Sequence, residues 1–301
     1  MKILVCDPME SSAVERMRLA GLTVDVRDSI TPDELNSVLK DYDGMVVRSR
    51  TKVRAPLIDL APNLKVIVRG GVGLDTIDAD YARSKGITVL NTPLSSSASV
   101  AELAIGFMIA LARAIPATTA SMRAGKWEKK KFEGDEIGGK TLGIVGIGNI
   151  GKEVAKRALA LGMDVVVYDP HAVAPEHLTR VSLDDLLSQA DYITFHMPLT
   201  QETRHMIDAA GFAKMKPGVR IINCARGGIV DEDALYDALV SGKVAGAALD
   251  VYAQEPCEGH KLFTLEQVIG SPHIGAATRE AQQRIGAEVA EKLIEFYHQM
   301  G

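Results

Sequence analysis

Three ionisable residues, Arg226, Glu255 and His273, each follow a strand-like apolar run late in the chain. A permanently charged guanidinium is rarely placed at the end of a buried strand such as 219–224 without an anion to meet. Carboxyl ends of parallel strands share one edge of a sheet, so the three side chains are expected to converge. A proton-moving histidine, a carboxylate that tunes it and an arginine that holds a carboxylate suit redox chemistry on a 2-hydroxy acid. Two plainer interpretations stay open: an internal salt bridge for Arg226 and a structural role for His273.

A glycine-rich turn, VGIGNIG from Val145 to Gly151, separates a strand-like run from a helical segment. Gly146, Gly148 and Gly151 fit G-x-G-x-x-G, a pattern that serves a tight turn, close approach to a pyrophosphate and close helix–strand packing. Asp169 ends the next strand, 18 residues beyond Gly151, where a carboxylate accepts from the hydroxyls of an adenosine ribose. The pattern predicts a dinucleotide site, with a turn that serves only packing as the alternative.

A second glycine-rich stretch, RGGVGLD (69–75), has Thr76 at the position of the third glycine and does not fit the dinucleotide pattern. Its backbone N–H groups, those of Gly71, Val72 and Gly73, suit a small anion. We expect them to bind the carboxylate of a substrate.

Strand-like runs alternate with helical segments along the chain, a pattern typical of parallel sheets with helices on both faces. Strands of a first series are expected at 2–6, 23–26, 44–47, 65–68 and 87–90. Strands of a second series are expected at 140–145, 164–169, 191–196, 219–224 and 244–250. Two such series predict an α/β protein with two doubly wound parallel-sheet domains.

No linker rich in proline or glycine separates the two series, and a long helix is expected at 99–114 instead. A closing helix at 277–300 has apolar residues at helical spacing. We expect it to return to the first domain, which makes that domain discontinuous (1–94 and 276–301) and leaves 95–275 as the dinucleotide-binding domain. A crevice between two α/β lobes is then the expected active site.

The composition, 47% hydrophobic and 24% charged, is that of an ordinary soluble protein. The net charge of −5 argues against a nucleic-acid partner. The chain opens without the apolar run of a signal peptide, and the most apolar stretch, Leu103–Ala112, is too short for a bilayer, so no membrane association is expected. Three scattered cysteines, Cys6, Cys224 and Cys257, lack metal-ligand spacing, which predicts no metal and reduced thiols in the cytoplasm.

The chain resembles the D-isomer-specific 2-hydroxyacid dehydrogenases over nearly its whole length. The resemblance is carried by RGGVGLDTID, NTPLSSSASVAELAIGFMIALAR, GKWEKKKFEGDEIGGKTLGIVGIGNIG, VYDP, HMPLT, NCARGGIVDEDAL, GAALDVYAQEP and SPHIGAAT. It implies a Rossmann nucleotide-binding domain plus a flavodoxin-like substrate domain, NAD as the cofactor, and a small-molecule substrate.

The resemblance also implies roles for single residues. His273 is the acid/base, Glu255 is its partner, and Arg226 orients the substrate carboxylate and carbonyl. Asp250 holds the nicotinamide carboxamide, and Asp169 binds the ribose. Further cofactor contacts are expected at Gly146, Gly148, Asn149, Ile150, Gly151, Pro198, Thr203, Cys224, Ala225 and Gly275.

Within the family, these motifs most resemble those of members that oxidise a phosphorylated 2-hydroxy acid, D-3-phosphoglycerate. Phosphate needs cations, and Arg48 and Arg69 end predicted strands beside the second glycine stretch, where we expect phosphate contact. Arg50 and Arg54, with Lys52 between them, are equally consistent with ordinary salt bridges. Reduction of glyoxylate or hydroxypyruvate is the alternative activity. An NAD-sensing corepressor with this fold is a more distant alternative, disfavoured because a binding module has no need of all three ionisable residues.

The resemblance suggests a homodimer or tetramer, formed through the long helix and the arm around GKWEKKKF (125–132). Its lysines at 129–131 would then add a positive field from a neighbouring subunit, unless they are only a solvated surface. Relatives that act on D-3-phosphoglycerate often carry further, serine-binding regulatory domains. This chain ends after the closing helix, so feedback by serine is not expected.

Overall fold

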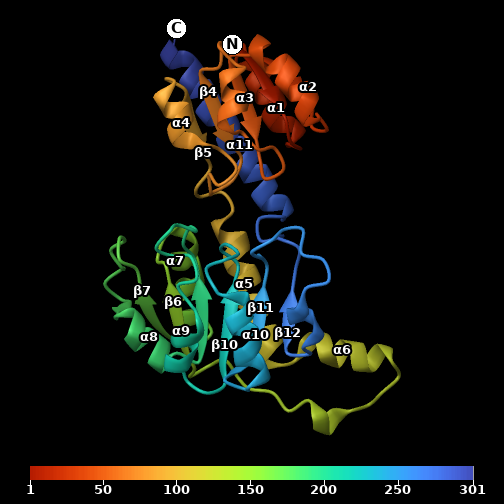
Figure 1. The fold of residues 1–301 in the computed structure, drawn as a ribbon, viewed down its shortest axis with the longest axis vertical. Coiled ribbons are helices and arrows are strands. Elements are labelled where there is room, and N and C mark those ends of the chain that lie inside the picture. The colour runs from red at the N-terminus through yellow and green to blue at the C-terminus, as the bar shows by residue number, and fades with distance from the viewer. Residues whose placement is uncertain (301) are drawn as a thin grey trace. The chain divides into compact units, whose positions relative to one another are not determined.

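The two series of strands form two separate parallel sheets in the computed structural model, which describes residues 1–300 (Figure 1). The chain divides into two compact units, Met1–Ser96 with the segment from Ala276 onward, and Ser97–Gly275. The last helix, α11 (Arg279–Met300), therefore packs with the N-terminal part of the chain.

The first unit contains a five-stranded sheet in the order β2-β1-β3-β4-β5, with all neighbours parallel. This is the flavodoxin-like order. The strands are β1 (Lys2–Val5), β2 (Thr23–Val26), β3 (Gly44–Val47), β4 (Val66–Arg69) and β5 (Thr88–Asn91). Before α11 come α1 (Ser11–Leu19), α2 (Pro32–Val38), η1 (Leu39–Asp41), α3 (Ala55–Asp59) and α4 (Ala79–Ser84).

Helices cover both faces of this sheet, which explains why its central strands are apolar at nearly every position. α1 and α11 pack together on one face, with Val14 and Ile285 in the same buried cluster. Leu35 of α2 and Leu57 of α3 belong to the cluster on the other face. Residues at the carboxyl ends of β1, β3 and β4 are therefore held on a rigid base.

The second unit contains a seven-stranded parallel sheet in the order β12-β11-β10-β9-β6-β7-β8. The strands are β6 (Thr141–Val145), β7 (Asp164–Tyr168), β8 (Thr179–Arg180), β9 (Tyr192–Phe195), β10 (Val219–Asn223), β11 (Val244–Leu249) and β12 (Val268–Gly270). The helices are α5 (Ser97–Ala112), α6 (Ile115–Arg123), η2 (Lys129–Lys131), α7 (Asn149–Ala160), α8 (Leu183–Gln189), α9 (Ala209–Lys214), α10 (Glu232–Val240) and η3 (Lys261–Thr264). This is the Rossmann order with one added strand, and its direction reverses between β6 and β9.

All ten predicted strands are present, and each end lies within one residue of its predicted position. Two strands, β8 and β12, were not among the predicted ten. The two residues of β8 are exposed at the sheet edge and carry no apolar pattern, and β12 has only three residues. The helix predicted at 99–114 begins two residues earlier and ends at Ala112. It ends there because Ala114 adopts a left-handed φ of 46°, after which Pro116 opens α6.

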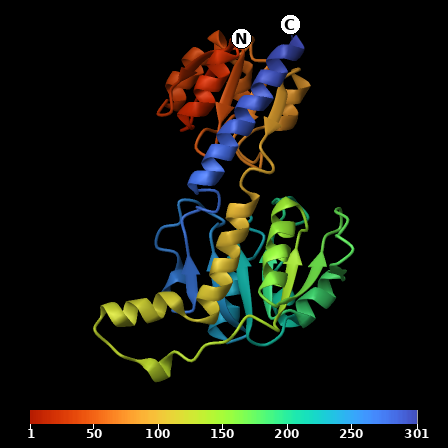
Figure 2. The same cartoon turned by 180° about the vertical axis from the view of Figure 1, so that it is seen from behind.

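α6 and the arm that follows it extend away from the sheet of the second unit (Figure 2). No residue of α6 is buried, and Trp127 in the arm is 80% exposed. Within residues 1–300 no single helix is long and apolar enough to span a membrane, and α5 and α6 reach that length only as a pair bent by 62°.

Candidate active site

The glycine-rich turn connects β6 to α7 at the point where the strand order reverses. Gly146 has a φ of 96°, and a Cβ there would lie 2.6 Å from the carbonyl oxygen of His196. A Cβ at Gly151 would overlap the carbonyl oxygen of Gly146, so this glycine lets α7 pack closely on the turn. Gly148, by contrast, faces open space. Gly146 therefore forms the tight turn, Gly148 leaves room for a ligand to approach the backbone, and Gly151 allows close packing of the helix.

Asp169 ties the end of β7 to this turn. Its Oδ2 accepts a hydrogen bond from the amide of Ile147 (2.9 Å), and its Oδ1 accepts from the amides of His171 and Ala172 (both 2.8 Å). Burial acts to raise the pKa of Asp169, but the three amide donors outweigh burial and hold the pKa below its ordinary value. The carboxylate is therefore ionised near neutrality and retains lone pairs for further donors.

Arg226 follows β10 in a turn shaped by two neighbours. The buried Asn223 accepts from the amide of Ala225 (3.1 Å) and donates to the carbonyl of Arg226 (2.9 Å). A Cβ at Gly227 would overlap the backbone of Tyr252, so glycine lets this turn lie directly against the segment that follows β11. The Arg226 turn and the Glu255 segment are thus in backbone contact.

Glu255 and His273 form a direct pair. Oε2 of Glu255 lies 2.8 Å from Nδ1 of His273, and Oε1 accepts from the amide of Tyr252 (3.1 Å). A carboxylate at Nδ1 holds a proton there and leaves Nε2 for a reacting group. His273 also has a φ of 54°, a conformation that is rare outside glycine and concentrated at functional sites.

Asp250 anchors the loop that carries His273. Its buried carboxylate accepts from Oγ of Ser271 (2.5 Å) and from the amides of Ile274 (2.8 Å) and Gly275 (2.7 Å). The sequence pattern predicted only a cofactor contact for Asp250. Its anchoring role had no local signal, because the contacts join segments 21 to 25 residues apart.

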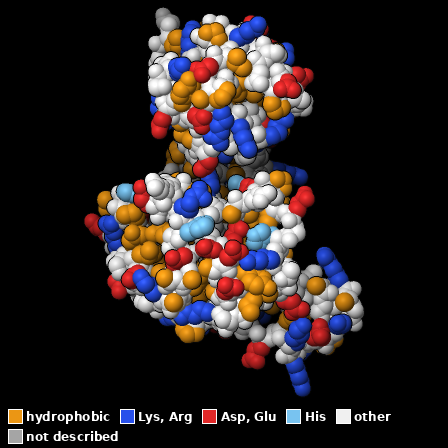
Figure 3. All heavy atoms as spheres, in the orientation of Figure 1, with side chains coloured by type: hydrophobic (Ala, Val, Ile, Leu, Met, Phe, Trp, Pro, Cys, Tyr) orange, Lys and Arg blue, Asp and Glu red, His pale blue; other side chains and the backbone are white. Residues whose placement is uncertain are grey.

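In the first unit, the side chains of Arg48 and Arg69 lie against Gly70 and Gly71 of the second glycine stretch, and basic side chains gather at this end of the unit (Figure 3). A Cβ at Gly70 would lie 3.4 Å from Cγ of Arg48, and a Cβ at Gly71 would overlap the Arg69 guanidinium. Nη1 of Arg48 donates to Oε1 of Gln282 on α11. Burial lowers the pKa of the Arg48 guanidinium from its usual value, but arginine stays charged at neutral pH.

The backbone amides of this stretch differ in what they contact. Gly71 donates to the carbonyl of Arg69 (2.9 Å), so that amide is already engaged. Among the described residues, no protein acceptor receives the amides of Val72 and Gly73. Two of the three amides predicted to bind a carboxylate are therefore available for an anion.

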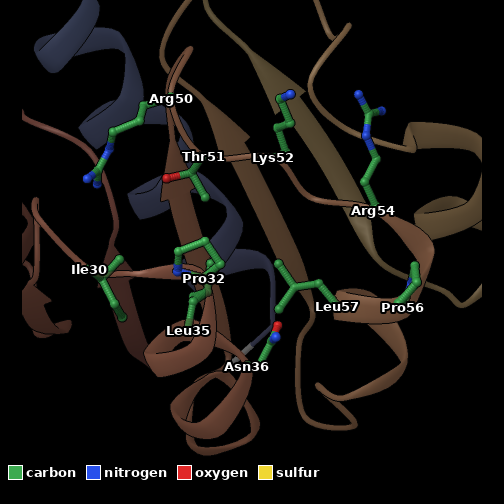
Figure 4. Close-up of a pocket in the computed structure, with 10 residues that line it drawn as sticks. All are labelled: Ile30, Pro32, Leu35, Asn36, Arg50, Thr51, Lys52, Arg54, Pro56 and Leu57. Atoms are coloured by element: carbon green, nitrogen blue, oxygen red, sulfur yellow. The ribbon is translucent and has the colours of Figure 1, made fainter.

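Arg50, Lys52 and Arg54 line a different feature (Figure 4). With Thr51 they form one side of a cavity of about 360 Å³ beside α2 and α3. The other lining residues are Ile30, Pro32, Leu35, Asn36, Pro56 and Leu57. Arg50 pairs with Asp7 (2.9 Å) and Arg54 pairs with Asp78 (2.8 Å). For these two arginines the salt-bridge interpretation describes the geometry.

Residues 105–275 match the model of a family described as D-isomer specific 2-hydroxyacid dehydrogenase, NAD binding domain. The chain belongs to the D-isomer-specific 2-hydroxyacid dehydrogenases. It is 49% identical over 298 residues to hydroxypyruvate reductase of Thermotoga maritima, a match that covers 97% of each chain. It is 48% identical over 300 residues to D-3-phosphoglycerate dehydrogenase of Methanocaldococcus jannaschii, covering 97% of this chain but 57% of that protein. A solved D-lactate dehydrogenase from Aquifex aeolicus, complexed with NAD and lactic acid, aligns with a TM-score of 0.87 and 31% identity over 99% of this chain and 96% of the other.

NAD is the cofactor of this dehydrogenase family, and the residues at the reversal point of the sheet fit it. Open space at Gly148 and the amides at the start of α7 suit a pyrophosphate, while the ionised Asp169 suits a ribose. The remaining predicted contacts follow strand ends at the same edge: Asn149 and Ile150 after β6, Pro198 and Thr203 after β9, Cys224 and Ala225 after β10, Asp250 after β11, and Gly275 after β12.

Two further residues of the dehydrogenase lie at this edge without any sequence signal that marked them. His196 is buried beside the glycine turn, with Nε2 3.0 Å from Oγ1 of Thr194. Burial lowers the pKa of His196 to about 3, so the imidazole is neutral. Arg180 of β8 donates to the carbonyl oxygen of Asp169 (2.6 Å), although the residues directly after Asp169, 170–177, contain no lysine or arginine.

Proposed function

We propose that this dehydrogenase oxidises D-3-phosphoglycerate to 3-phosphohydroxypyruvate with NAD, the first step of serine biosynthesis. The observation that carries the proposal is the placement of two arginines at the second glycine stretch, with Cγ of Arg48 against Gly70 and the Arg69 guanidinium against Gly71. A phosphate monoester is largely dianionic near neutrality, and the planar guanidinium fork forms paired, charge-assisted hydrogen bonds with it. The name of the relative from Methanocaldococcus jannaschii supports the same substrate.

His273 moves the proton in the proposed mechanism. In oxidation its Nε2 takes the proton of the 2-hydroxyl group, and the C2–O bond becomes a carbonyl as a hydride leaves C2. When bound, NAD supplies the acceptor for that hydride. In reduction the protonated Nε2 returns a proton to the carbonyl oxygen. Glu255 at Nδ1 fixes the ring and stabilises the imidazolium.

The substrate carboxylate needs its own partners. Arg226 is proposed to orient this carboxylate and the adjoining carbonyl oxygen through its planar donor pair. In the first unit, the amides of Val72 and Gly73 are proposed as two neutral donors for an anionic group of the substrate. In this proposal the substrate carboxylate is an anion that Arg226 contacts.

Reduction of hydroxypyruvate is the second candidate function. It is favoured by the relative from Thermotoga maritima, which carries that name and is matched over 97% of both chains. Hydroxypyruvate has no phosphate, so this activity would assign no phosphate contact to Arg48 or Arg69. The arginine pair is the reason for preferring a phosphorylated substrate.

A comparison of three keto acids separates the two candidates. Initial rates of reduction are measured with 3-phosphohydroxypyruvate, hydroxypyruvate and glyoxylate, each with NADH and with NADPH, and oxidation of D-3-phosphoglycerate is measured with NAD. We expect the highest kcat/KM for the phosphorylated acid with NADH. A higher kcat/KM for hydroxypyruvate or glyoxylate would replace the proposed substrate with the reductase activity.

We also propose a homodimer formed through α6 and the arm that follows it. Ile115 and Met122 of α6 are 46% and 55% exposed, and Trp127 of the arm is 80% exposed. Large exposed apolar side chains gathered on one segment are typical of a contact between subunits.

A further inference from the structure

Glu232, the first residue of α10, turns its side chain away from its own helix. The helix is capped instead by Asp231, which accepts from the amides of Asp233 and Ala234 (both 3.0 Å). Oε1 of Glu232 accepts from the amide of Ala253 (2.7 Å), and Oε2 lies 3.1 Å from Nε2 of His260. The carboxylate, 15% exposed, therefore binds the segment that follows β11.

The tautomer of His260 follows from its second nitrogen. Nδ1 accepts a hydrogen bond from the amide of Leu262 (3.3 Å), so Nδ1 carries no proton and Nε2 does. Nε2–H then donates to Glu232, and the bond needs no positive charge on the imidazole. Hydrogen bonds to an ionised carboxylate are about twice as strong as those between neutral groups.

The segment bound by Glu232 is the one that carries Glu255. Ala253 lies between Glu255 and Tyr252, whose amide donates to Oε1 of Glu255 (3.1 Å). The hydroxyl of Tyr252 lies 3.1 Å from the carbonyl oxygen of Ser271, in the loop that carries His273. A shift of the backbone at Ala253 would therefore move both members of the Glu255–His273 pair.

Packing of the Glu255 side chain does not hold it in place, since that side chain is 37% exposed. Its position depends on where the backbone of residues 252–255 lies. The same short stretch of chain, from Arg226 to Glu232, touches this backbone twice. Gly227 contacts Tyr252, and Glu232 binds Ala253.

We propose that Glu232, supported by His260, is a positioning residue that keeps Glu255 in contact with Nδ1 of His273. The proposal rests on the proposed function, because it matters for turnover only if Glu255 and His273 perform the proton transfer. Glu232 itself touches no reacting atom.

The test compares Glu232→Ala, Glu232→Gln and His260→Ala with a matched control, Asp233→Asn. The control removes the neighbouring carboxylate of α10, which pairs with Lys261 at the surface. We expect Glu232→Ala to lower kcat by about tenfold to a hundredfold, the scale of a small misplacement of catalytic groups. KM for NAD should change by less than about twofold, because the glycine turn and Asp169 are untouched.

Glu232→Gln should restore part of kcat. The amide oxygen of the glutamine still accepts from the amide of Ala253. Its NH₂ group then faces Nε2–H of His260, and because both groups are donors, the charge-assisted bond from His260 is lost. His260→Ala should show an intermediate loss. A purely structural role would instead lower Tm in all three variants while kcat of the folded enzyme stayed at the wild-type value, and that result would overturn the proposal.

His273→Ala, measured in parallel, separates this proposal from the proposed function. Near-normal turnover by His273→Ala would contradict proton transfer by His273, and with it the proposed role of Glu232. If His273→Ala is inactive while Glu232→Ala is folded and fully active, the positioning role of Glu232 is wrong and the proposed function stands. If Glu232→Ala does not fold, Glu232→Gln and His260→Ala decide: lowered kcat with unchanged KM for NAD supports the proposal, and unchanged kcat in both overturns it.

Discussion

The carboxylate of Glu255 lies 2.8 Å from Nδ1 of His273, although 18 residues separate them and each sits on a loop. Neither side chain is deeply buried, with 37% and 44% of its surface exposed. Their contact is maintained by the backbone instead, through Asp250 under the His273 loop and Tyr252 between the two loops. The backbone thus holds the proton carrier in place while part of its side chain stays exposed.

Removal of the proton carrier tests the centre of the mechanism. His273→Ala is expected to lose about two to four decades of kcat, the usual contribution of general acid–base catalysis. The dissociation constant for NADH, measured by fluorescence titration, should stay near the wild-type value. His177→Ala, which removes an exposed histidine of the same unit, is the control and should keep full activity.

Cofactor choice depends on the charge at the end of β7. Asp169 would meet the 2′-phosphate of NADP as a like charge, so the wild type should prefer NAD strongly. Asp169→Ala should narrow this preference, mainly by weakening NAD binding. Because Arg180 lies beside Asp169, it becomes a partner for the 2′-phosphate once the carboxylate is gone.

The double variant Asp169→Ala, Arg180→Gln should therefore lose the NADP activity that the single variant retains, while Arg180→Gln alone should change NAD use little. Michaelis constants for both cofactors provide the measurement. Equal use of NAD and NADP by the wild type would contradict this account of Asp169.

Recognition of phosphate is tested at the two arginines that lie against the glycine stretch. Arg48→Ala or Arg69→Ala should raise KM for D-3-phosphoglycerate by about tenfold or more, the scale of losing one charge-assisted pair. Oxidation of unphosphorylated D-glycerate should change much less. Arg54→Ala, which removes an arginine paired with Asp78, is the matched control and should leave both substrates unaffected. An equal rise of KM for both substrates would contradict the assignment of Arg48 and Arg69 to phosphate binding.

Two glycines of the nucleotide turn should respond oppositely to alanine. Gly148 has an ordinary φ of −67° and open space around it, so Gly148→Ala should fold with a normal Tm but bind NAD more weakly. Gly151→Ala would force a methyl group into the carbonyl of Gly146 and should cost about 1–3 kcal/mol of unfolding free energy. Thermal unfolding and NADH titration of both variants provide the check. Unchanged NAD affinity in Gly148→Ala would mean that the turn serves packing only.

The proposed dimer predicts a change of mass in solution. Trp127→Glu combined with Met122→Glu should shift the protein from dimer to monomer in light scattering coupled to gel filtration, because both side chains are exposed in one chain. Leu19→Glu, on an equally exposed apolar residue of α1, should leave the mass unchanged. A wild type that is monomeric at micromolar concentration would refute the interface.

Much of the architecture followed from the sequence because its signals are short-range. Largely apolar runs of four to seven residues between helical segments predicted ten strands, since a strand buried on both faces is apolar at nearly every position. The spacing of Gly146, Gly148 and Gly151 predicted the nucleotide turn. Gly146 and Gly151 meet steric requirements that a side chain would violate, while Gly148 leaves open space in front of the turn. Arg226, Glu255 and His273 were recognisable as chemistry-bearing residues by type and by their place after strands.

Only the tertiary structure decided which of these side chains meet and what holds them. Among the basic residues at and after the ends of β3 and β4, the structure places the side chains of Arg48 and Arg69 against Gly70 and Gly71. It pairs Arg50 with Asp7 and Arg54 with Asp78 instead. It also brought Arg180 to Asp169, Asp250 to the His273 loop, and Glu232 to Ala253. The hydrogen bonds and salt bridges among these contacts join residues 11 to 43 positions apart in the chain. Strand order and loop packing determine them, and neither is encoded in the spacing of neighbouring residues.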